Sequence, residues 1–437
     1  MEQSHSFGPI RLAPGVLPRH VFAYLFAAFV SIGMFTYLIA LTPYILNVNL
    51  GLPEDQQGQI SGDLQFWQEI VLLGVIGWWG AISDRVGRRV VYIAGFAILA
   101  VAYVSYGFAT STLQLTGFRL IFAMGVAATT TSLAAVLADY AHEDSRGKLT
   151  GISFFLNGLG SVIFFIGLLQ LPQFFAGRGI DEIWAGRYAM MIAGGIALTA
   201  AAVMFGLKPG RAIETIDRPS VARLMGEGVL AARNPRIAIA YVSAFAARAD
   251  MAILTLFLTL WVVQAVIAGG GTATEAAARA GMVGGIAQIA AVIWAPIFGI
   301  VGDKIDRLTL LVVAFLISTI GYGWVASTDD ILSMSAIPAL LCLGAGLSSA
   351  QLGSTVLLAQ ESPAGVRGST FGVQSFCGAI GILVLSAGGG RLFDSIGPQA
   401  PFVAVATANG VVLALAVVRR AIELRGVPTT AAAVETD

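Results

Sequence analysis

The side chains in this sequence that are best suited to chemistry are charged residues embedded in long apolar stretches. Arg248 and Asp250 lie within SAFAARADMAILTLF, and Glu69 lies within DLQFWQEIVLLG. A guanidinium in a low-dielectric cavity binds a carboxylate, a sulfonate or a phosphate through two parallel hydrogen bonds. A buried carboxyl group favours its neutral form and can therefore take up and release a proton. These residue types predict binding of an anion and movement of protons.

The positions of Arg248 and Asp250 predict that both lie deep in a membrane. Arg248 follows Arg236 by twelve residues, which is about 18 Å of helix, and the hydrocarbon core of a bilayer is about 30 Å thick. A charged side chain at that depth costs at least about 2.5 kcal/mol, so it needs a partner or a watery cavity. Residues two apart point to opposite sides of a helix. We expect one of the pair to face a cavity and the other a neighbouring helix; an ion pair that only holds helices together is the alternative.

Glu69 has a second polar residue beside it. Gln65 precedes Glu69 by one helical turn, so the two lie on one face. Glu69 also precedes Asp84 by fifteen residues, which is about 22 Å of helix. The sequence predicts a proton carrier at Glu69, with Asp250 as a second candidate. A structural, hydrogen-bonded carboxyl is the alternative for Glu69.

Uncharged polar residues in other apolar stretches could add contacts to a bound solute. Ser31 occupies the position in the first apolar stretch that corresponds to Arg248, and amide side chains lie at Gln288, Gln351 and Gln374. We include these four residues in the predicted substrate site together with Arg248 and Asp250, although hydrogen bonds between helices explain the four at least as well.

Several classes of function are disfavoured by what the apolar stretches lack. The histidines, His5, His20 and His142, all lie outside them, so we expect no metal site and no membrane enzyme. The sequence has no loop with the Gly-Lys-Ser/Thr of nucleotide-binding proteins, so we expect neither ATP as a drive nor another cofactor. Lysine plus arginine (25) equals aspartate plus glutamate (25), which gives no excess of basic charge for nucleic acid.

The elements that must position these residues are membrane-spanning helices. The chain of 437 residues is 57% hydrophobic and 11% charged, whereas soluble domains carry roughly 25% charged residues. A spanning helix needs about 20 mostly apolar residues, and lipid excludes unpaired backbone groups, which favours helices. We predict an all-α membrane protein with twelve transmembrane helices, near residues 21–47, 63–82, 90–109, 114–140, 149–171, 187–207, 236–264, 277–302, 308–326, 333–360, 369–388 and 401–420.

The two halves of the sequence resemble each other. Asp84 and Asp303 lie 219 residues apart, and Arg146 and Arg367 lie 221 residues apart. The nearly constant offset predicts two six-helix pseudo-symmetric halves, with a binding site between them near the midplane of the membrane. The predicted division is a first half at 1–207, a cytoplasmic linker with an amphipathic helix at 208–235, and a second half with a short disordered tail at 236–437.

Basic residues are distributed unevenly between the loops. With both termini inside, most of the lysines and arginines between the predicted spans fall on the cytoplasmic side, and the other side receives few of them. The positive-inside rule therefore predicts cytoplasmic N- and C-termini. We expect a multi-pass protein of the cell inner membrane that acts as a monomer.

A charged motif follows the second predicted span, in the segment GAISDRVGRR. Its glycine and charged positions include Gly80, Asp84, Arg85, Gly87 and Arg88. This segment closely resembles the loop 2–3 signature of the major facilitator superfamily, and the twelve spans and the repeat extend the resemblance over nearly the whole chain. Glycines let membrane helices approach closely. The resemblance implies a cytoplasmic gate in which Asp84 contacts the start of the eleventh helix, near Arg367.

Further segments fit the same resemblance. Asp303 and Arg307 belong to a second copy of the motif, GIVGDKIDR, in which Asp306 replaces the second glycine, so we expect a weaker or differently wired gate there. Arg146 resembles the Arg-Gly motif of loop 4–5, and we place it with the gating residues. Arg119 resembles the arginine of the fourth-helix motif, which is linked to proton movement in some relatives. An arginine that reaches towards the nearby outer surface is the alternative.

These observations predict a secondary transporter of the major facilitator type rather than an enzyme. We expect it to move a small or amphipathic organic anion by alternating access, with protons as the coupling ion in symport or antiport. The alternative is a multidrug/proton antiporter that exports hydrophobic compounds. Span five contains Gly158 and Gly160 but not the Gly-Pro pair that the resemblance implies for drug antiporters, so we place this alternative second.

Overall fold

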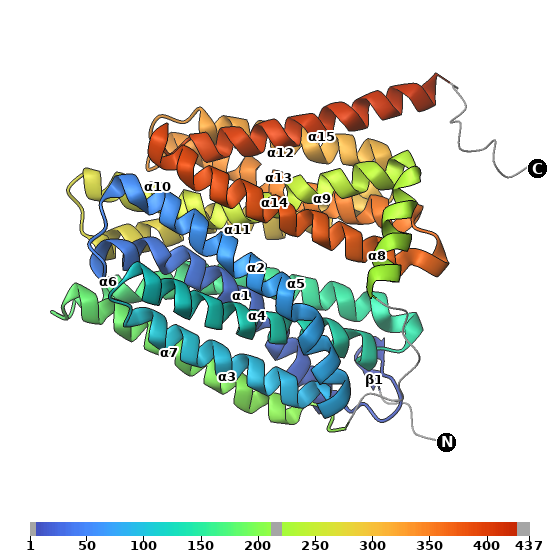
Figure 1. The fold of residues 1–437 in the computed structure, drawn as a ribbon, viewed down its shortest axis with the longest axis horizontal. Helices are drawn as coiled ribbons and strands as arrows, with labels where there is room; N and C mark the ends of the chain where they lie inside the picture. Colours follow the sequence, from blue (N-terminus) through green and yellow to red (C-terminus); the bar gives the residue numbers. More distant parts are fainter. Residues whose placement is uncertain (1–5, 211–220, 426–437) are drawn as a thin grey trace, which may run out of the picture. The chain divides into compact units, whose positions relative to one another are not determined.

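The computed structural model describes residues 6–210 and 221–425, and nearly all of these residues lie in helices (Figure 1). Twelve helical segments in this part of the chain are long and apolar enough to cross a membrane, which confirms the all-α membrane fold and the twelve predicted spans. Their bounds are Pro18–Val48, Glu54–Val86, Arg88–Gly107, Thr112–Tyr140, Glu143–Ala176, Glu182–Gly206, Pro235–Ala268, Ala273–Gly302, Arg307–Ala326, Met334–Glu361, Arg367–Ser395 and Ala400–Leu424.

Several helices run past the predicted apolar stretches, because their polar ends also satisfy helix geometry. Helix α2 spans Glu54–Val86, whereas its apolar stretch covers only 63–82. Glu54 and Asp55 lie in its first turn, where the helix dipole favours acidic residues. Gly87 ends the helix with φ of 101°, a conformation that glycine adopts without steric cost. Hydropathy alone detects none of these signals.

The chain divides into two compact units. Unit 1 is drawn from Met1–Glu214 and Thr259–Gly285, and unit 2 from Thr215–Leu258 and Ile286–Asp437. Segment Thr259–Gly285 therefore groups with unit 1, whereas the sequence pattern assigns it to the second half. The predicted boundaries at 207 and 236 describe the repeat in the sequence, whereas the two units describe which residues pack together. The predicted boundaries therefore stay a prediction.

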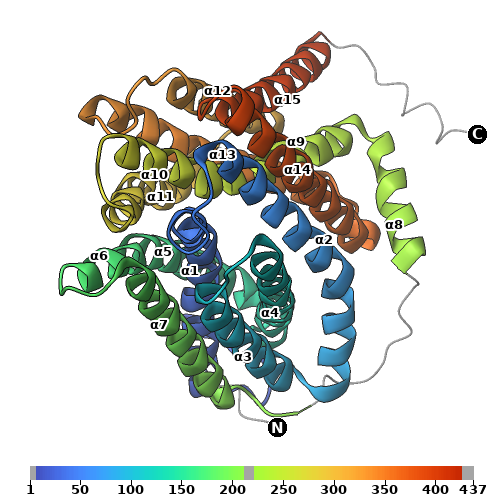
Figure 2. The same ribbon diagram turned by 60° about the vertical axis from the view of Figure 1, so that its left-hand side comes forward.

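Unit 1 is built around helix α1. Helix α1 packs against α4, α5 and α7, and Figure 2 shows these helices beside it. The elements of unit 1 are β1 (Ser6–Phe7), β2 (Ile10–Arg11), α1 (Pro18–Val48), α2 (Glu54–Val86), α3 (Arg88–Gly107), α4 (Thr112–Tyr140), η1 (Glu143–Ser145), α5 (Arg146–Leu169), α6 (Leu171–Ala176), α7 (Glu182–Val203), η2 (Met204–Gly206) and α10 (Thr259–Ala268).

Unit 2 is built around helix α9, which packs against α13, α14 and α15. The elements of unit 2 are α8 (Val221–Leu230), η3 (Ala231–Arg233), α9 (Pro235–Ile253), the π-helical segment η4 (Leu254–Leu258), α12 (Arg307–Ala326), η5 (Met334–Ala336), α13 (Ile337–Glu361), η6 (Ala364–Val366), α14 (Arg367–Ser395) and α15 (Ala400–Leu424). Helix α11 (Ala273–Gly302) begins in unit 1 and ends in unit 2.

The same backbone contact occurs once in each unit. In unit 1, a Cβ added to Gly160 of α5 would overlap the carbonyl oxygen of Phe29 on α1. In unit 2, a Cβ added to Gly381 of α14 would overlap the carbonyl oxygen of Phe245 on α9. The two glycines lie 221 residues apart and the two phenylalanines 216, which agrees with the offset of the repeat. Close helix pairs of this kind need a residue without a side chain.

A short N-terminal segment closes one end of unit 1, a feature that the sequence pattern did not predict. Strands β1 and β2 form a hairpin, and the Arg11 amide donates to Ser145 Oγ at 3.0 Å. The Ala13 amide donates to the Tyr140 carbonyl at 3.0 Å. Ile10 and Leu12 are buried in the core of the unit. We call residues 6–16 the N-terminal strap.

The linker contains a helix where the sequence predicts one. Helix α8 spans Val221–Leu230 and packs against α14. The carbonyl of its Gly228 accepts from the hydroxyl of Tyr241 on α9 at 2.7 Å. Val229 and Leu230 are exposed, so contact of this helix with a membrane surface stays a prediction. Residues 211–220 of the linker and the predicted tail at 426–437 lie outside the described residues.

Candidate functional site

Helix α9 carries both charges that the sequence places at mid-membrane. The helix begins at Pro235, preceded by Asn234, whose Oδ1 accepts from the Arg236 amide at 2.9 Å. Arg248 lies on α9 with an exposed side chain, and its stem lies against Gly378 of α14, where an added Cβ would overlap Arg248 Cδ. Within the described part of the chain its guanidinium forms no hydrogen bond and no ion pair. Arg248 is therefore available to a solute.

Asp250 points away from Arg248 and is fully buried. Its Oδ2 accepts from Ser318 Oγ of α12 at 3.1 Å, and its Oδ1 accepts from Asn409 Nδ2 of α15 at 3.1 Å. Tyr322 of α12 donates its hydroxyl to the backbone carbonyl of Asp250 at 2.6 Å. The carboxyl group thus faces a neighbouring helix pair and not Arg248, which is one of the two arrangements that the spacing allows. Ser318 and Asn409 were missed by sequence reasoning, because a serine and an asparagine in apolar spans give no distinctive pattern.

Two of the predicted amides lie on helices that pack against α9. Gln351 of α13 contacts Met251 Sδ at 3.9 Å, one helical turn after Arg248. Gln374 of α14 lies one turn before Gly378, and its Nε2 donates to Ser354 Oγ at 3.1 Å. Gln351 and Gln374 therefore lie close to α9, and their predicted role in substrate binding stays a prediction.

The other two predicted contacts lie elsewhere. Gln288 is buried on α11, and its Nε2 has no hydrogen-bond partner in the described part of the chain. Ser31 is buried in unit 1, where it donates to the Ala27 carbonyl at 2.7 Å. Their predicted role in substrate binding stays a prediction.

Unit 1 buries its own arginine. Arg119 of α4 is 1% exposed, and its Nη2 donates to Gln65 Oε1 of α2 at 3.1 Å. The ring of Phe122 lies 5.6 Å from the guanidinium carbon, a distance that suits a cation–π contact. In the described residues, Arg119 Nε and Nη1 have no hydrogen-bond partner. The side chain is therefore buried against α2 and does not reach for the outer surface.

Helix α2 presents a stripe of buried polar residues to the rest of unit 1. Its members are Gln57, Ser61, Gln65, Gln68 and Glu69, each at most 6% exposed. At about 100° per residue they fall within roughly 120° of the helix circumference. Sequence reasoning found only Gln65 and Glu69, although the i, i+4 spacing from Gln57 onwards could have revealed the others. The stripe places Glu69 one turn from the residue that binds Arg119.

The loop 2–3 motif forms a charge cluster in unit 1. Arg88 Nη1 pairs with Asp84 at 2.6 Å, and Arg88 Nε pairs with Asp139 at the end of α4 at 3.1 Å. Gly87 provides the positive φ between α2 and α3. A Cβ added to Gly80 would lie 3.7 Å from the Thr131 side chain, which is an ordinary van der Waals contact. A glycine is therefore not required for close packing at this position. The cluster joins α2, α3 and α4.

The remaining predicted gating residues are less constrained. Arg85, Arg146 and Arg367 are exposed, and Arg367 donates to the Ala359 carbonyl at 3.1 Å. The predicted contact between Asp84 and the start of the eleventh helix would join the two units and stays a prediction.

The charged residues of the second copy of the motif form different contacts from those of the first copy. Asp303 is 81% exposed and lies 3.6 Å from Arg307. Asp306, which replaces the glycine, caps α12 by accepting from the amides of Leu308 and Thr309, both at 3.1 Å. The strong charge contacts of unit 2 instead converge on Arg236, which pairs with three acidic residues.

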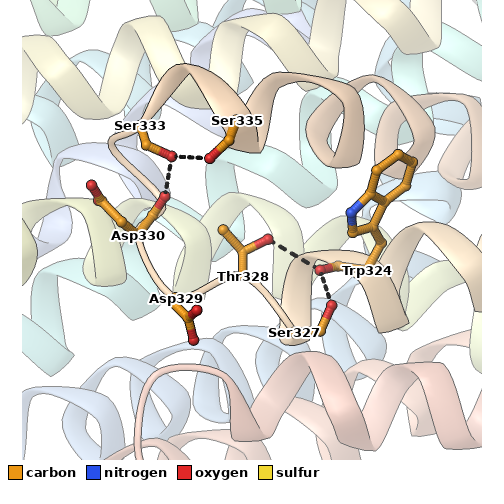
Figure 3. A pocket seen from close by; sticks show the side chains of 7 residues that line it. All are labelled: Trp324, Ser327, Thr328, Asp329, Asp330, Ser333 and Ser335. Atoms are coloured by element: carbon orange, nitrogen blue, oxygen red, sulfur yellow. Dashed lines mark hydrogen bonds between the residues drawn. The ribbon is translucent and has the colours of Figure 1, made fainter.

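A surface pocket in unit 2 lies in the loop between α12 and α13 (Figure 3). Its lining residues are Trp324, Ser327, Thr328, Asp329, Asp330, Ser333 and Ser335. Ser333 bonds to the Asp330 carbonyl and to Ser335, and both Ser327 and Thr328 donate to the Trp324 carbonyl. These polar groups stabilise the loop itself, and none of the predicted site residues lines the pocket.

Comparison with known proteins identifies the family. The model of a family described as the Major Facilitator Superfamily matches residues 23–386. The chain belongs to the Major Facilitator Superfamily. The match agrees with the twelve candidate spans, so the chain is a multi-pass membrane protein.

Curated relatives of this facilitator include magnetosome proteins and a citrate exporter. Magnetosome protein MamH of Paramagnetospirillum magneticum is 26% identical over 407 residues, which cover 91% of each chain. Magnetosome protein MamZ of the same organism is 26% identical over 380 residues, 84% of this chain but only 58% of MamZ, so the facilitator spans little more than half of that relative. Citrate exporter 1 of Aspergillus niger is 29% identical over 205 residues, 42% of this chain and 36% of the exporter.

Solved structures of other facilitators share the fold. The nucleoside transporter NupG superposes with a TM-score of 0.70 at 13% identity, covering 92% of this chain and 98% of NupG. A bacterial homologue of the lysosomal transporter Spinster, inward-facing and unoccupied, gives a TM-score of 0.65 at 15% identity and covers 95% and 100%. At such identities the likeness concerns the fold alone.

Proposed function

We propose that this facilitator moves a small or amphipathic organic anion across the cell inner membrane by alternating access, with protons as the coupling ion. The observation that carries the proposal is Arg248, an exposed guanidinium deep in α9 with no polar partner in the described residues. Keeping an unpaired arginine at such depth is costly. A mobile anion would supply the missing partner, which explains why the charge is present despite this cost.

The chemistry of Arg248 favours carboxylates, sulfonates and phosphates. The planar guanidinium offers a fork of N–H donors that matches two oxygen atoms of one such group. Gln351 and Gln374, on helices packed against α9, would add neutral hydrogen bonds that orient the rest of the solute. An arginine with amide neighbours suits an anion better than a cationic drug, so multidrug export ranks second.

One relative supports the same class of solute. The name of Citrate exporter 1 says that this relative exports citrate, which is an organic anion with three carboxyl groups. The match covers 42% of the present chain. We therefore take citrate as the first probe, without assigning it as the physiological substrate.

Coupling to protons requires a group that is protonated in one state and charged in another. Asp250, and Glu69 with Arg119 beside its helix, are the candidates in units 2 and 1. The charge cluster around Asp84 and Arg88 would act as a gate on the side that we propose to be cytoplasmic, together with both termini. We propose a monomer, because each chain supplies both repeat halves.

Transport in liposomes tests the proposal. We expect purified protein to exchange labelled citrate, or another carboxylate from a panel, across the liposome membrane. Arg248→Ala should lower this exchange by at least about tenfold, because a charge-assisted hydrogen bond contributes about 1.5–3 kcal/mol. Arg178→Ala is the matched control, since Arg178 is an exposed arginine in a loop and its guanidinium contacts Phe174 one turn away.

Two outcomes would contradict the proposal. Full exchange by Arg248→Ala would remove Arg248 from the substrate site. Movement of cationic hydrophobic drugs without movement of any anion would favour the multidrug alternative instead.

A further inference from the structure

Three helices of unit 2 meet at a buried polar site around Asp250. Asp250 of α9, Ser318 of α12 and Asn409 of α15 are each 0% exposed. Asn409 Nδ2 lies 3.1 Å from Asp250 Oδ1, 3.3 Å from Asp250 Oδ2 and 2.9 Å from Ser318 Oγ. Each helix therefore contributes one side chain, and the carboxyl group is the only one of the three that can carry charge.

No charged residue faces the Asp250 carboxyl within the described part of the chain. Helix α12 offers Ser318 and the hydroxyl of Tyr322, which is already bonded to the Asp250 backbone. Helix α15 offers Asn409, and on α9 itself Arg248 points to the other side. A dehydrated metal cation needs about six oxygen ligands, more than these side chains supply. A proton needs only one oxygen, so it is the ion that fits.

Asn409 has one polar atom that the site does not use. Its Oδ1 has no hydrogen-bond partner in the described residues, although the side chain is fully buried. An unsatisfied buried carbonyl costs free energy and needs an explanation. With its NH2 group towards Asp250, the amide serves the charged carboxylate, which only accepts hydrogen bonds. Rotation of the amide by about 180° would place the oxygen there instead, where it accepts from a protonated carboxyl.

We propose that Asp250 is the proton-binding group of this facilitator and that Asn409 is a positioning residue whose amide turns over when the carboxyl gains or loses its proton. This inference rests on the proposed function and selects Asp250 from its proton candidates. The charged form is held by Ser318 and by the NH2 group of Asn409, which ties α9 to both α12 and α15. The acid form donates its proton to the amide oxygen and leaves the NH2 group without its former acceptors, so the contact with α15 weakens.

The position of the site links the proton to the solute. Asp250 and Arg248 lie two residues apart on opposite sides of α9, so a shift of α9 relative to α15 also moves Arg248. Helix α9 ends at Ile253 and continues as the π-helical segment Leu254–Leu258, a local irregularity of the kind found at functional sites. Since Asp250 is fully buried, its proton exchanges only when this packing opens, which is the condition for coupling.

Infrared difference spectroscopy of the full chain at a series of pH values tests the inference without any substrate. We expect the wild type to show a pH-dependent carbonyl band that is absent from Asp250→Asn, in addition to any band from the buried carboxyl group of Glu69. Asn409→Ala should shift the pH midpoint of this band by about one unit, because donors to the charged form are lost. Thr319→Val is the control, since its hydroxyl bonds within its own helix to the Phe315 carbonyl. If Asn409→Ala does not fold, Asn409→Ser replaces it.

Transport provides the second arm of the test. In Asp250→Asn, citrate exchange should lose its response to a pH gradient. A pH-dependent band that is the same in Asp250→Asn as in the wild type, or a midpoint that Asn409→Ala leaves unchanged, would overturn the inference even if the anion is transported. A failure of citrate exchange in the wild type, with the infrared result as expected, would instead contradict the proposed substrate and leave the proton site standing.

Discussion

Arg236 at the start of α9 and Glu423 near the end of α15 form a two-point ion pair in unit 2. The Nη2–Oε2 distance is 2.8 Å and the Nε–Oε1 distance is 2.9 Å. Arg236 Nη1 also pairs with Glu361 of α13 at 2.8 Å. One guanidinium thus holds three helices together, although the sequence pattern registered Arg236 only as a basic residue near a span end.

Loss of this arginine should destabilise unit 2. We expect Arg236→Ala to lower the free energy of unfolding by about 2–3 kcal/mol, between the cost of breaking a buried ion pair and that of an exposed one, because the partly buried Glu361 and Glu423 lose their counter-charge. Thermal unfolding of purified protein measures the effect. Arg223→Ala is the control, since the Arg223 side chain is 72% exposed and pairs one turn away with Glu227. Equal melting temperatures for both variants would contradict the prediction.

Asp306 should make stability depend on pH in the acid range. Partial burial alone would raise the pKa of Asp306, but the amides of Thr309 and Leu308 and the charges of Arg236 and Arg420 outweigh it, so the pKa is lowered from 3.8. Asp306 therefore stabilises the folded state above pH 3.8, and this contribution is lost as the pH falls from there through the lowered pKa. Asp306→Asn keeps the helix cap but not the charge. We expect its melting temperature to fall less steeply than that of the wild type below about pH 4; parallel curves would contradict this.

Gly378 should matter for transport through its contact with Arg248. A Cβ at this position overlaps Arg248 Cδ, so Gly378→Ala must displace the guanidinium without removing its charge. We expect anion exchange to fall by about tenfold or more, as a misplaced binding group loses most of its contribution. Gly372→Ala on the same helix is the matched control, because an added Cβ there meets nothing within 4 Å. Equal exchange rates in the two variants would show that Arg248 acts from another position.

Replacement of the glycine in the repeated contact should be equally destabilising in both units. Gly160→Ala and Gly381→Ala each force a methyl group into a carbonyl oxygen of the facing helix, so α1 must move from α5 and α9 from α14. We expect a loss of stability of about 1–3 kcal/mol in each variant, the usual cost of overpacking. Gly388→Ala, which has free space on α14, should change little. Melting temperatures measure the effect of all three substitutions. An unchanged melting temperature for Gly160→Ala or Gly381→Ala would contradict the prediction.

Most of the fold could be predicted from the sequence because lipid imposes simple requirements. Twelve apolar stretches must form helices, and a near-constant offset between charged motifs reveals the repeat. Helix ends were less predictable, since α2 continues through the polar residues from Glu54 to its apolar part. Pairing of helices could not be predicted, because it depends on contacts such as Gly160 against the carbonyl of Phe29, which no local pattern encodes.

The candidate site was predictable in its charges and not in its partners. The cost of a charge in lipid singled out Arg248 and Asp250, and their spacing implied opposite sides of one helix. Which side each occupies depends on small residues far away in sequence, since Gly378 makes room for the arginine. Asn409 and Ser318 give no signal of their own, because neutral polar residues are common in membrane helices.

The N-terminal strap has a consequence for biosynthesis. Its residues are translated before their partners: Arg11 bonds to Ser145, 134 residues later, and the Pro14 carbonyl accepts from Lys208, 194 residues later. The strap therefore has to wait until α4, α5 and α7 have been inserted, and it docks among the last elements of unit 1.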